Sequence, residues 1–170
     1  MDAYLAIVAK REVRAYADRP IPEEVVERLL EAGRVTGSSM NRQAWRFLAL
    51  ETPEIRHAVA DTVYAPANLR GAALAVAIVV TGGATADFDA GRAAQNIMLA
   101  ALNDGVGSCP NGVADRDRFA ELIPLEEGER PAIVLSFGFP ARAYRPEDRS
   151  PDEWIRRARR KPATEVVSRL

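Results

Sequence analysis

The sequence predicts a single-domain α+β fold, and three observations support this prediction. Helical and strand patterns alternate along all 170 residues, but their spacing does not repeat a regular β–α–β unit, which disfavours a doubly wound parallel sheet. Residues 72–81 (AALAVAIVVT) form a continuous apolar run, as expected of a strand that is buried on both faces. Residues 87–104 carry alanines and larger apolar residues at helical spacing, which is typical of a central helix.

Residues that start or stop an element bound most of the predicted helices and strands. Pro22 and the two glutamates after it favour the first turn of a helix, because proline fits there and carboxylates interact well with the positive helix end. Thr52 is a good helix cap, and residues 105–112 (GVGSCPNG) predict a turn that ends the central helix sharply. The predicted helices are residues 2–10, 22–36, 52–60, 87–104, 115–123 and 151–160, and the predicted strands are residues 46–51, 72–81 and 132–138.

The composition excludes several classes of protein. With 48% hydrophobic and 28% charged residues, the chain is of the ordinary globular type. One Cys and one His exclude a disulfide framework and disfavour a transition-metal site, so no metal is expected. A pI near 5.9 disfavours nucleic-acid binding, and the longest apolar run is too short to span a bilayer. The N-terminus shows no signal peptide, so we expect a cytoplasmic protein without nucleic-acid or membrane partners.

Positive charge gathers near both ends of a chain whose formal net charge is only −1. Lys10, Arg11 and Arg14 fall within five residues, and residues 156–161 contain four arginines and a lysine. Two such clusters are suited to hold one anionic group, such as a phosphate, from two sides. On charge alone, two solvated faces are the simpler interpretation.

No short motif identifies a catalytic centre. There is no P-loop, and Gly105-x-Gly107 follows a helix rather than a strand, so it does not fit the dinucleotide-binding pattern. His57 is expected to be exposed on a helix. Cys109 has no histidine near it in the sequence, which favours a small packed side chain over a nucleophile.

Two pairs of aspartates have the spacing of helix starts rather than of acid–base catalysts. Asp115 and Asp117 are interpreted as a helix cap and a solvated neighbour. Asp87 and Asp89, at the head of the central helix, are interpreted in the same way.

Five segments in a fixed order resemble the FMN-dependent nitroreductase family. Residues 10–47 contain KREVRAY, a proline-initiated helix and TGSSMNRQAWRF, where the family has Arg-Arg-Ser-Val-Arg-x-Phe, a similar helix and Ala-Pro-Ser-x-x-Asn-x-Gln-Pro-Trp-x-Phe. Residues 89–109 resemble the family's central dimer helix and the turn after it. Residues 133–141 (IVLSFGFPA) resemble its last core strand, and residues 159–167 (RRKPATEVV) its C-terminal phosphate-binding signature.

The resemblance implies a nitroreductase-like fold, with a mostly antiparallel sheet flanked by helices, in an intertwined homodimer that binds FMN at the subunit interface. It implies an enzyme that takes a hydride from NADH or NADPH and passes electrons through flavin N5 to a nitroaromatic, a quinone or a similar small acceptor in a ping-pong reaction. No catalytic side chain is then needed. Reductive dehalogenation, flavin breakdown, enone reduction and non-catalytic FMN binding or sensing stay open as alternatives, as does the choice between NADH and NADPH.

The resemblance also assigns residues to the phosphate end of FMN. Lys10, Arg11, Glu12 and Arg14 fall on the family's phosphate and ribityl contacts, and Arg160 falls on the arginine that closes over the phosphate. Glu12 stands where the family has Ser or Thr. We therefore expect Glu12 to turn outward or to pair with a neighbouring arginine, leaving the phosphate to the arginines.

Further residues are assigned to the flavin ring. Gly107, Ser108 and Cys109 match the turn along the ring, where small residues allow close backbone approach. Asn68 and Arg70 are weaker matches to ring-edge contacts. The remaining matches, Ser38, Ser39 and Asn41, fall on the loop that reaches the flavin of the other subunit.

The sequence also bears on oligomeric state and on the substrate pocket. The helix at residues 87–104 is too apolar to face water, which favours a dimer through that helix. The chain is short for the family and has little room for an insertion over the substrate pocket, so we expect an open pocket or a small lid.

Overall fold

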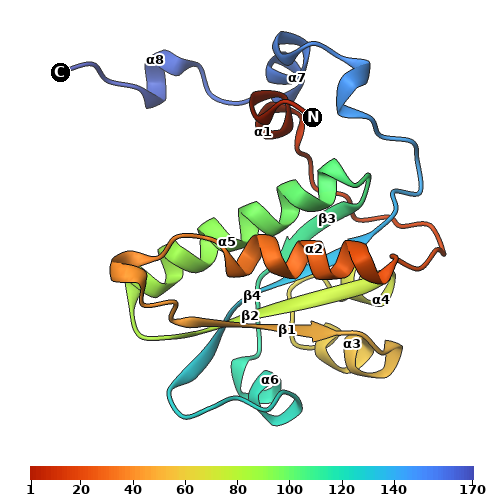
Figure 1. Cartoon of the computed structure of the whole chain (residues 1–170), viewed down its shortest axis with the longest axis vertical. Coiled ribbons are helices and arrows are strands. Elements are labelled where there is room, and N and C mark those ends of the chain that lie inside the picture. The colour runs from red at the N-terminus through yellow and green to blue at the C-terminus, as the bar shows by residue number, and fades with distance from the viewer.

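The computed structural model describes residues 1–170 and shows a four-stranded antiparallel sheet between two layers of helices (Figure 1). The strands are β1 (Trp45–Leu50), β2 (Leu74–Thr81), β3 (Gly107–Asn111) and β4 (Glu129–Gly138), in the order β1-β2-β4-β3. The helices are α1 (Ala3–Ala9), α2 (Glu23–Arg34), α3 (Pro53–Ala60), α4 (Pro66–Arg70), α5 (Ala84–Asn103), α6 (Arg116–Leu122), α7 (Pro151–Ala158) and α8 (Ala163–Val166), with short 3₁₀ turns η1 (Ser39–Asn41) and η2 (Pro146–Asp148). The predicted α+β class is confirmed.

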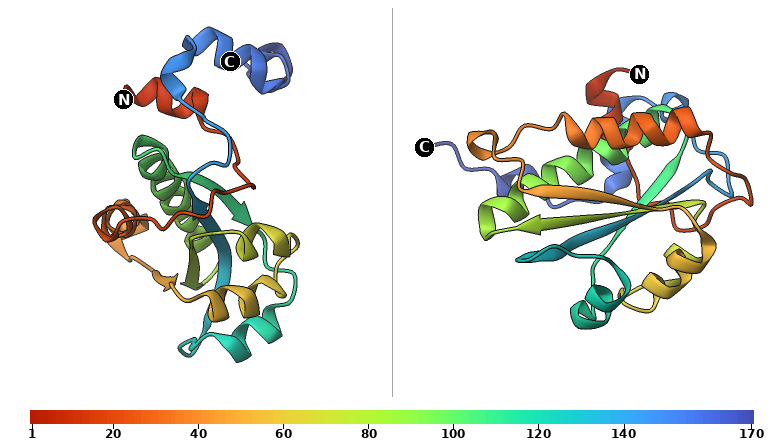
Figure 2. Two further views of the ribbon diagram at one scale, coloured as in Figure 1. Left: turned by 90° about the vertical axis from the view of Figure 1, so that its right-hand side faces the viewer. Right: turned by 60° about the horizontal axis from the view of Figure 1, so that its bottom comes forward.

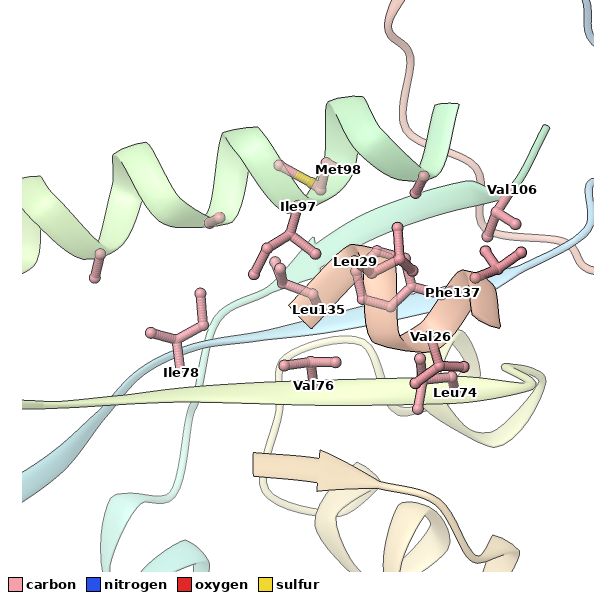
Figure 3. Close-up of a cluster of buried hydrophobic side chains, with 14 of the residues drawn as sticks. Val26, Leu29, Leu74, Val76, Ile78, Ile97, Met98, Val106, Leu135 and Phe137 are labelled. Carbon is pink, nitrogen blue, oxygen red and sulfur yellow. The ribbon is translucent and has the colours of Figure 1, made fainter. Parts of the chain in front are cut away.

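Strand β2 is the centre of the fold, and its prediction as a strand buried on both faces is confirmed. Residues 74–80 are all buried. Leu74, Val76, Ile78 and Val80 face α2 and α5, where they meet Leu135 and Phe137 of β4 (Figure 3). The alternating residues of β2 face the opposite layer of α3, α4 and α6. The strand therefore joins two apolar cores, one on each side of the sheet (Figure 2).

Helix α5 packs its alanine-rich side against the sheet and α2 within one chain. At Gly33 of α2 a Cβ atom would lie 2.8 Å from Cδ1 of Ile97, so a larger residue there would require the Ile97 side chain to move. The outer face of α5 exposes Phe88, Arg92 and Gln95. The apolar side of this helix is covered within one chain, while its exposed outer face still includes Phe88, so the expected dimer through this helix stays a prediction.

Several predicted boundaries need correction. Residues 107–111 are strand β3 rather than part of a turn, because they pair with β4 along their whole length. Helices α4 and α8 were not predicted, and α5 begins at Ala84, three residues before its predicted start. Asp115 caps α6 as expected, and His57 is exposed on α3 as expected.

The two ends of the chain meet on the same side of the molecule, where α1 packs against α7 (Figure 1). Beyond α7, residues 159–170 are all exposed, and the segment that carries α8 extends away from the sheet (Figures 1 and 2). No helix of the structure is both long and apolar enough to cross a membrane.

Candidate functional site

Residues 10–14 lie beside the start of β3, so two segments that are about 100 residues apart in the sequence form one surface. Glu12 and Ser108 form an isolated parallel bridge, and the Val13 N–H donates to the Ser108 carbonyl at 3.0 Å. Gly107 permits this contact, because a Cβ atom there would lie 2.7 Å from Val13. The small size of Gly107 is thus already required by the packing of the chain itself.

The three residues assigned to the flavin ring are buried under this contact. Gly107 is buried, Ser108 and Cys109 are 1% and 2% exposed, and Ser108 Oγ has no hydrogen-bond partner. Exposure begins at Pro110, the next residue of β3. The accessible part of this edge therefore starts one residue after the assigned segment.

Lys10 and Glu12 form an ion pair within the segment. The Lys10 side chain is only 6% exposed, and its Nζ lies 3.0 Å from Glu12 Oε2. The same Nζ also donates to the carbonyls of Arg11 and Ser108, which uses its three donors. Glu12 was expected to turn outward or to pair with an arginine: its side chain is exposed, as the first alternative expected, and its ionic partner is Lys10 rather than an arginine.

Arg11 holds the two ends of the chain together. Its guanidinium donates to the carbonyls of Val8 and Lys10 and, at 2.7 Å, to that of Trp154 in α7. It also lies 5.4 Å from the Trp154 ring centroid, within the range of a cation–π contact. Most of its hydrogen-bonding capacity is therefore used inside the protein.

Arg14 and Arg160 are the cations of the assigned set that form neither an ion pair nor a hydrogen bond to a backbone carbonyl. Both are exposed, and neither has a carboxylate partner within 4.0 Å. Arg14 lies next to Cys109: burial raises the pKa of the Cys109 thiol, and a hydrogen bond from Arg14 opposes this shift. The free positive charge beside β3 is therefore that of Arg14.

A buried polar network, which the sequence did not reveal as a group, lies under the same edge. Asn68 donates to Asn111 Oδ1 at 2.8 Å and to Cys109 Sγ at 3.7 Å. Asn111 also donates to Ser136 Oγ, which lies 2.9 Å from the Tyr16 hydroxyl. The network brings Asn68 to the site, and its one visible sequence signal is a serine within the apolar strand pattern of β4.

Tyr16 anchors residues 10–14 to the sheet. Its hydroxyl donates to the Val13 carbonyl at 2.7 Å and lies within hydrogen-bonding distance of Ser136. Burial raises the pKa of Tyr16, so the hydroxyl stays protonated at any physiological pH. Arg70, by contrast, points to Asp61, with which it forms an ion pair, and it is half exposed.

The loop with Ser38, Ser39 and Asn41 lies at the other end of α5 (Figure 1). The Ser39 N–H donates to Asp89 Oδ2 at 2.8 Å near the start of the helix, whereas β3 follows the helix end at Asn103. These two points of α5 are about 20 Å apart along its axis. One chain therefore does not bring this loop to β3. Asp89, expected to be solvated, is 6% exposed.

Comparison with known proteins identifies the family. The model described as "Nitroreductase family" matches residues 7–82 and 67–139 of this chain. A Methanothermobacter thermautotrophicus protein named "Putative NADH dehydrogenase/NAD(P)H nitroreductase" is 30% identical over 152 residues, which cover 83% of this chain and 78% of that protein. A related Archaeoglobus fulgidus protein of the same name is 28% identical over 145 residues, 79% of this chain and 83% of that protein.

Solved structures share the fold. A nitroreductase family protein from Clostridium difficile 630 superposes with a TM-score of 0.80 at 22% identity, covering 99% of this chain and 98% of its own. A protein described as an FMN-dependent nitroreductase, from Clostridium difficile R20291, gives a TM-score of 0.77 at 21% identity, covering 85% of this chain and 90% of its own. With its fold and its sequence in agreement, this chain belongs to the nitroreductase family and is an oxidoreductase.

Proposed function

We propose that the protein is an FMN-dependent NAD(P)H oxidoreductase that reduces nitroaromatics, quinones or similar small acceptors. The observation that carries this proposal is the pairing of residues 10–14 with β3, which leaves the Arg14 guanidinium without an ion pair beside Cys109 of the strand. The name of one structural neighbour includes FMN, and the names of two relatives include NAD(P)H. When bound, FMN supplies the hydride acceptor and donor of such a reaction.

The charges at this edge fit a phosphate-bearing cofactor. Lys10 neutralises Glu12, so the carboxylate that replaces the family hydroxyl does not leave a free negative charge there. We assign the phosphate to Arg14 and Arg160, whose guanidinium groups are suited to paired hydrogen bonds with phosphate oxygens. Lys10 and Arg11 shape the segment, because their donors are used by carbonyls and by Glu12.

The ring end is assigned to the edge formed by Asn68, Cys109 and their neighbours. The network from Asn68 to Tyr16 holds β3 and residues 10–14 in one fixed arrangement, which limits reorganisation when a flat ring binds. No acid–base pair lies at this edge, which suits a reaction whose chemistry belongs to the cofactor. Cys109, with its raised pKa, stays a neutral thiol near neutral pH.

We further propose that the protein is a homodimer in which each site takes residues from both copies. The loop at residues 38–41 is held at Asp89, about 20 Å along the α5 axis from the helix end that leads into β3, so we assign it to the site of a second copy. The exposed residues 159–170, which include Val166 and Val167 at 63% and 60% exposure, offer apolar surface for a partner. Light scattering of the full chain and of a chain ending at Ala158 tests this. A monomeric full chain that holds flavin would contradict the shared site.

The cofactor assignment is tested by absorption and by two arginine variants. Purified protein should be yellow and should release FMN when denatured. Arg14→Ala and Arg160→Ala should each weaken FMN binding by about 10- to 100-fold, since a hydrogen bond to a charged group contributes about 1.5–3 kcal/mol. Arg118→Ala, an exposed arginine on α6 without an ion pair, is the control. Full flavin occupancy in both test variants would refute the phosphate assignment.

Turnover separates the enzyme from a flavin-binding or sensing protein. Rapid bleaching of the flavin absorbance by NADH or NADPH, followed by reoxidation with a nitroaromatic, supports the oxidoreductase. Reduction by dithionite but by neither nicotinamide would instead support storage or sensing.

A further inference from the structure

A polar cavity, lined in part by Tyr16, lies between the segment that leads into α2 and the helices α3 and α4. It has a volume of about 490 Å³, and its wall includes residues 17–20, Pro53 at the start of α3 and residues 70–73 after α4. Of the residues assigned to FMN by resemblance, only Arg70 lines it. The cavity is large enough for a small organic molecule.

Arg56, at the base of this cavity, is a buried cation without a counterion. It is 8% exposed, its Nη1 donates to the carbonyls of Leu50 and Glu51, and its buried Nε has no hydrogen-bond partner. No carboxylate lies within ion-pair distance of it. Burial lowers the pKa of Arg56, and the nearby carboxylate of Glu54 opposes this shift.

A buried charge of this kind is costly unless it is paired. The carbonyl contacts satisfy part of the guanidinium but leave its charge unbalanced. Because Arg56 lines an open cavity, an anion from solution is able to reach the side chain.

The rim of the cavity is also positive. Arg19 lies there with its guanidinium 3.8 Å from the centroid of the Phe139 ring, which holds the side chain in place. His57 and Arg70 line the same wall, and Asp18 is the only carboxylate that lines the cavity. Arg70 is already paired with Asp61, so Arg56 and Arg19 are the arginines of the wall that are left for an anion, and arginine forks match the oxygens of a phosphate.

We propose that this cavity is a binding site for a phosphate dianion, either inorganic phosphate or a phosphate monoester, held by Arg56 at the base and by Arg19 at the rim. Arg14, Arg160 and Cys109 of the proposed flavin site do not line this cavity, whereas Tyr16 and Arg70 do. Asn68 and Arg70 belong to the same short helix α4, so an occupied cavity touches the element that carries Asn68 to the flavin edge.

The test uses the full-length holoprotein and titrates it with inorganic phosphate and, separately, with glycerol phosphate. Isothermal titration should show saturable binding of at least one probe with a dissociation constant in the millimolar range or tighter, and the tighter probe identifies the source of the phosphate. Arg19→Gln should weaken this binding by about tenfold or more, which corresponds to about 1.4 kcal/mol. Arg118→Gln, which removes an exposed arginine outside the cavity, should bind as the native protein does.

Arg56→Gln tests the base of the cavity, provided that its circular dichroism and melting curve show a folded protein. If it does not fold, the Arg19→Gln result alone decides. Non-saturable binding, an equal loss in Arg19→Gln and Arg118→Gln, or release of FMN by phosphate would each overturn the proposal. Release of FMN would mean that the phosphate probe had entered the flavin site. Loss of flavin binding in Arg14→Ala with phosphate binding intact would support two separate sites.

Discussion

Replacing Gly107 with alanine tests the contact on which the candidate site depends. A Cβ atom at this position would lie 2.7 Å from Cβ and Cγ1 of Val13 and 2.9 Å from its Cγ2. Since the neighbouring atom is a branched carbon close to the backbone, residues 10–14 must move away from β3. Overpacking costs about 1–3 kcal/mol, and loss of the bond between the Val13 N–H and the Ser108 carbonyl costs about 1 kcal/mol more.

Gly107→Ala should therefore destabilise the fold by about 2–4 kcal/mol, which for a chain of this size lowers the melting temperature by about 5–15 °C. FMN occupancy should fall with it, because Arg14 moves with the displaced segment. Gly71→Ala is the control, since its Cβ would meet only the Ala67 carbonyl at an ordinary 3.5 Å. A melting temperature and flavin content equal to those of the native protein would show that residues 10–14 do not pack on β3 in solution.

Three further predictions follow from individual side chains. Tyr16→Phe should lower the free energy of unfolding by about 1–3 kcal/mol in urea titrations, because it removes a buried hydroxyl that bonds on both sides. The hydrogen bonds from Arg46 lower the pKa of Glu129, so the stability that this carboxylate contributes is present above its unfolded pKa of about 4.3 and is lost as the pH falls through the folded value. Melting temperatures between about pH 3 and 6 should therefore fall more for the native protein than for Glu129→Gln. Glu12→Ser should change the dissociation constant of FMN, measured by equilibrium dialysis, by less than about tenfold, because Lys10 already neutralises Glu12; a much tighter complex would mean that the carboxylate repels the phosphate.

The sequence alone located those helices and strands whose hydrophobic pattern matches their burial in the fold. Strand β2 is apolar throughout because both of its faces are covered, so periodicity and burial give the same result. Strand β3 was missed because its sequence, GSCPN, consists of residues that favour turns. Its extended shape comes from pairing with β4, which is far away in the sequence, and local preference gives no sign of that pairing.

In the candidate site, too, contacts between residues close in the sequence were predictable, and contacts between distant residues were not. The resemblance to a family drew attention to residues 10–14, and the structure lays them beside β3. The pairing of Lys10 with Glu12 is local, since side chains two residues apart in an extended segment lie on the same face. The contact of Arg11 with Trp154 is not local, because it joins residues 143 positions apart. From the sequence alone, Lys10, Arg11 and Arg14 are equally available to bind a phosphate. In the structure, Lys10 and Arg11 bind Glu12 and backbone carbonyls, and only Arg14 is left without such partners.

The proposed dimer is favoured by the position of the loop at residues 38–41 rather than by the composition of α5. The apolar pattern of α5 favours a dimer when the sequence is considered alone, but α2 and the sheet cover that apolar side within one chain. What favours a second copy is distance: the loop at residues 38–41 is held at the start of α5 by Asp89, while β3 begins beyond the end of the same helix. Two such helices packed antiparallel would bring the loop of one chain to the strand edge of the other. In the proposed homodimer, closed two-fold symmetry would give two equivalent sites from one contact, and neither site would be complete without its partner.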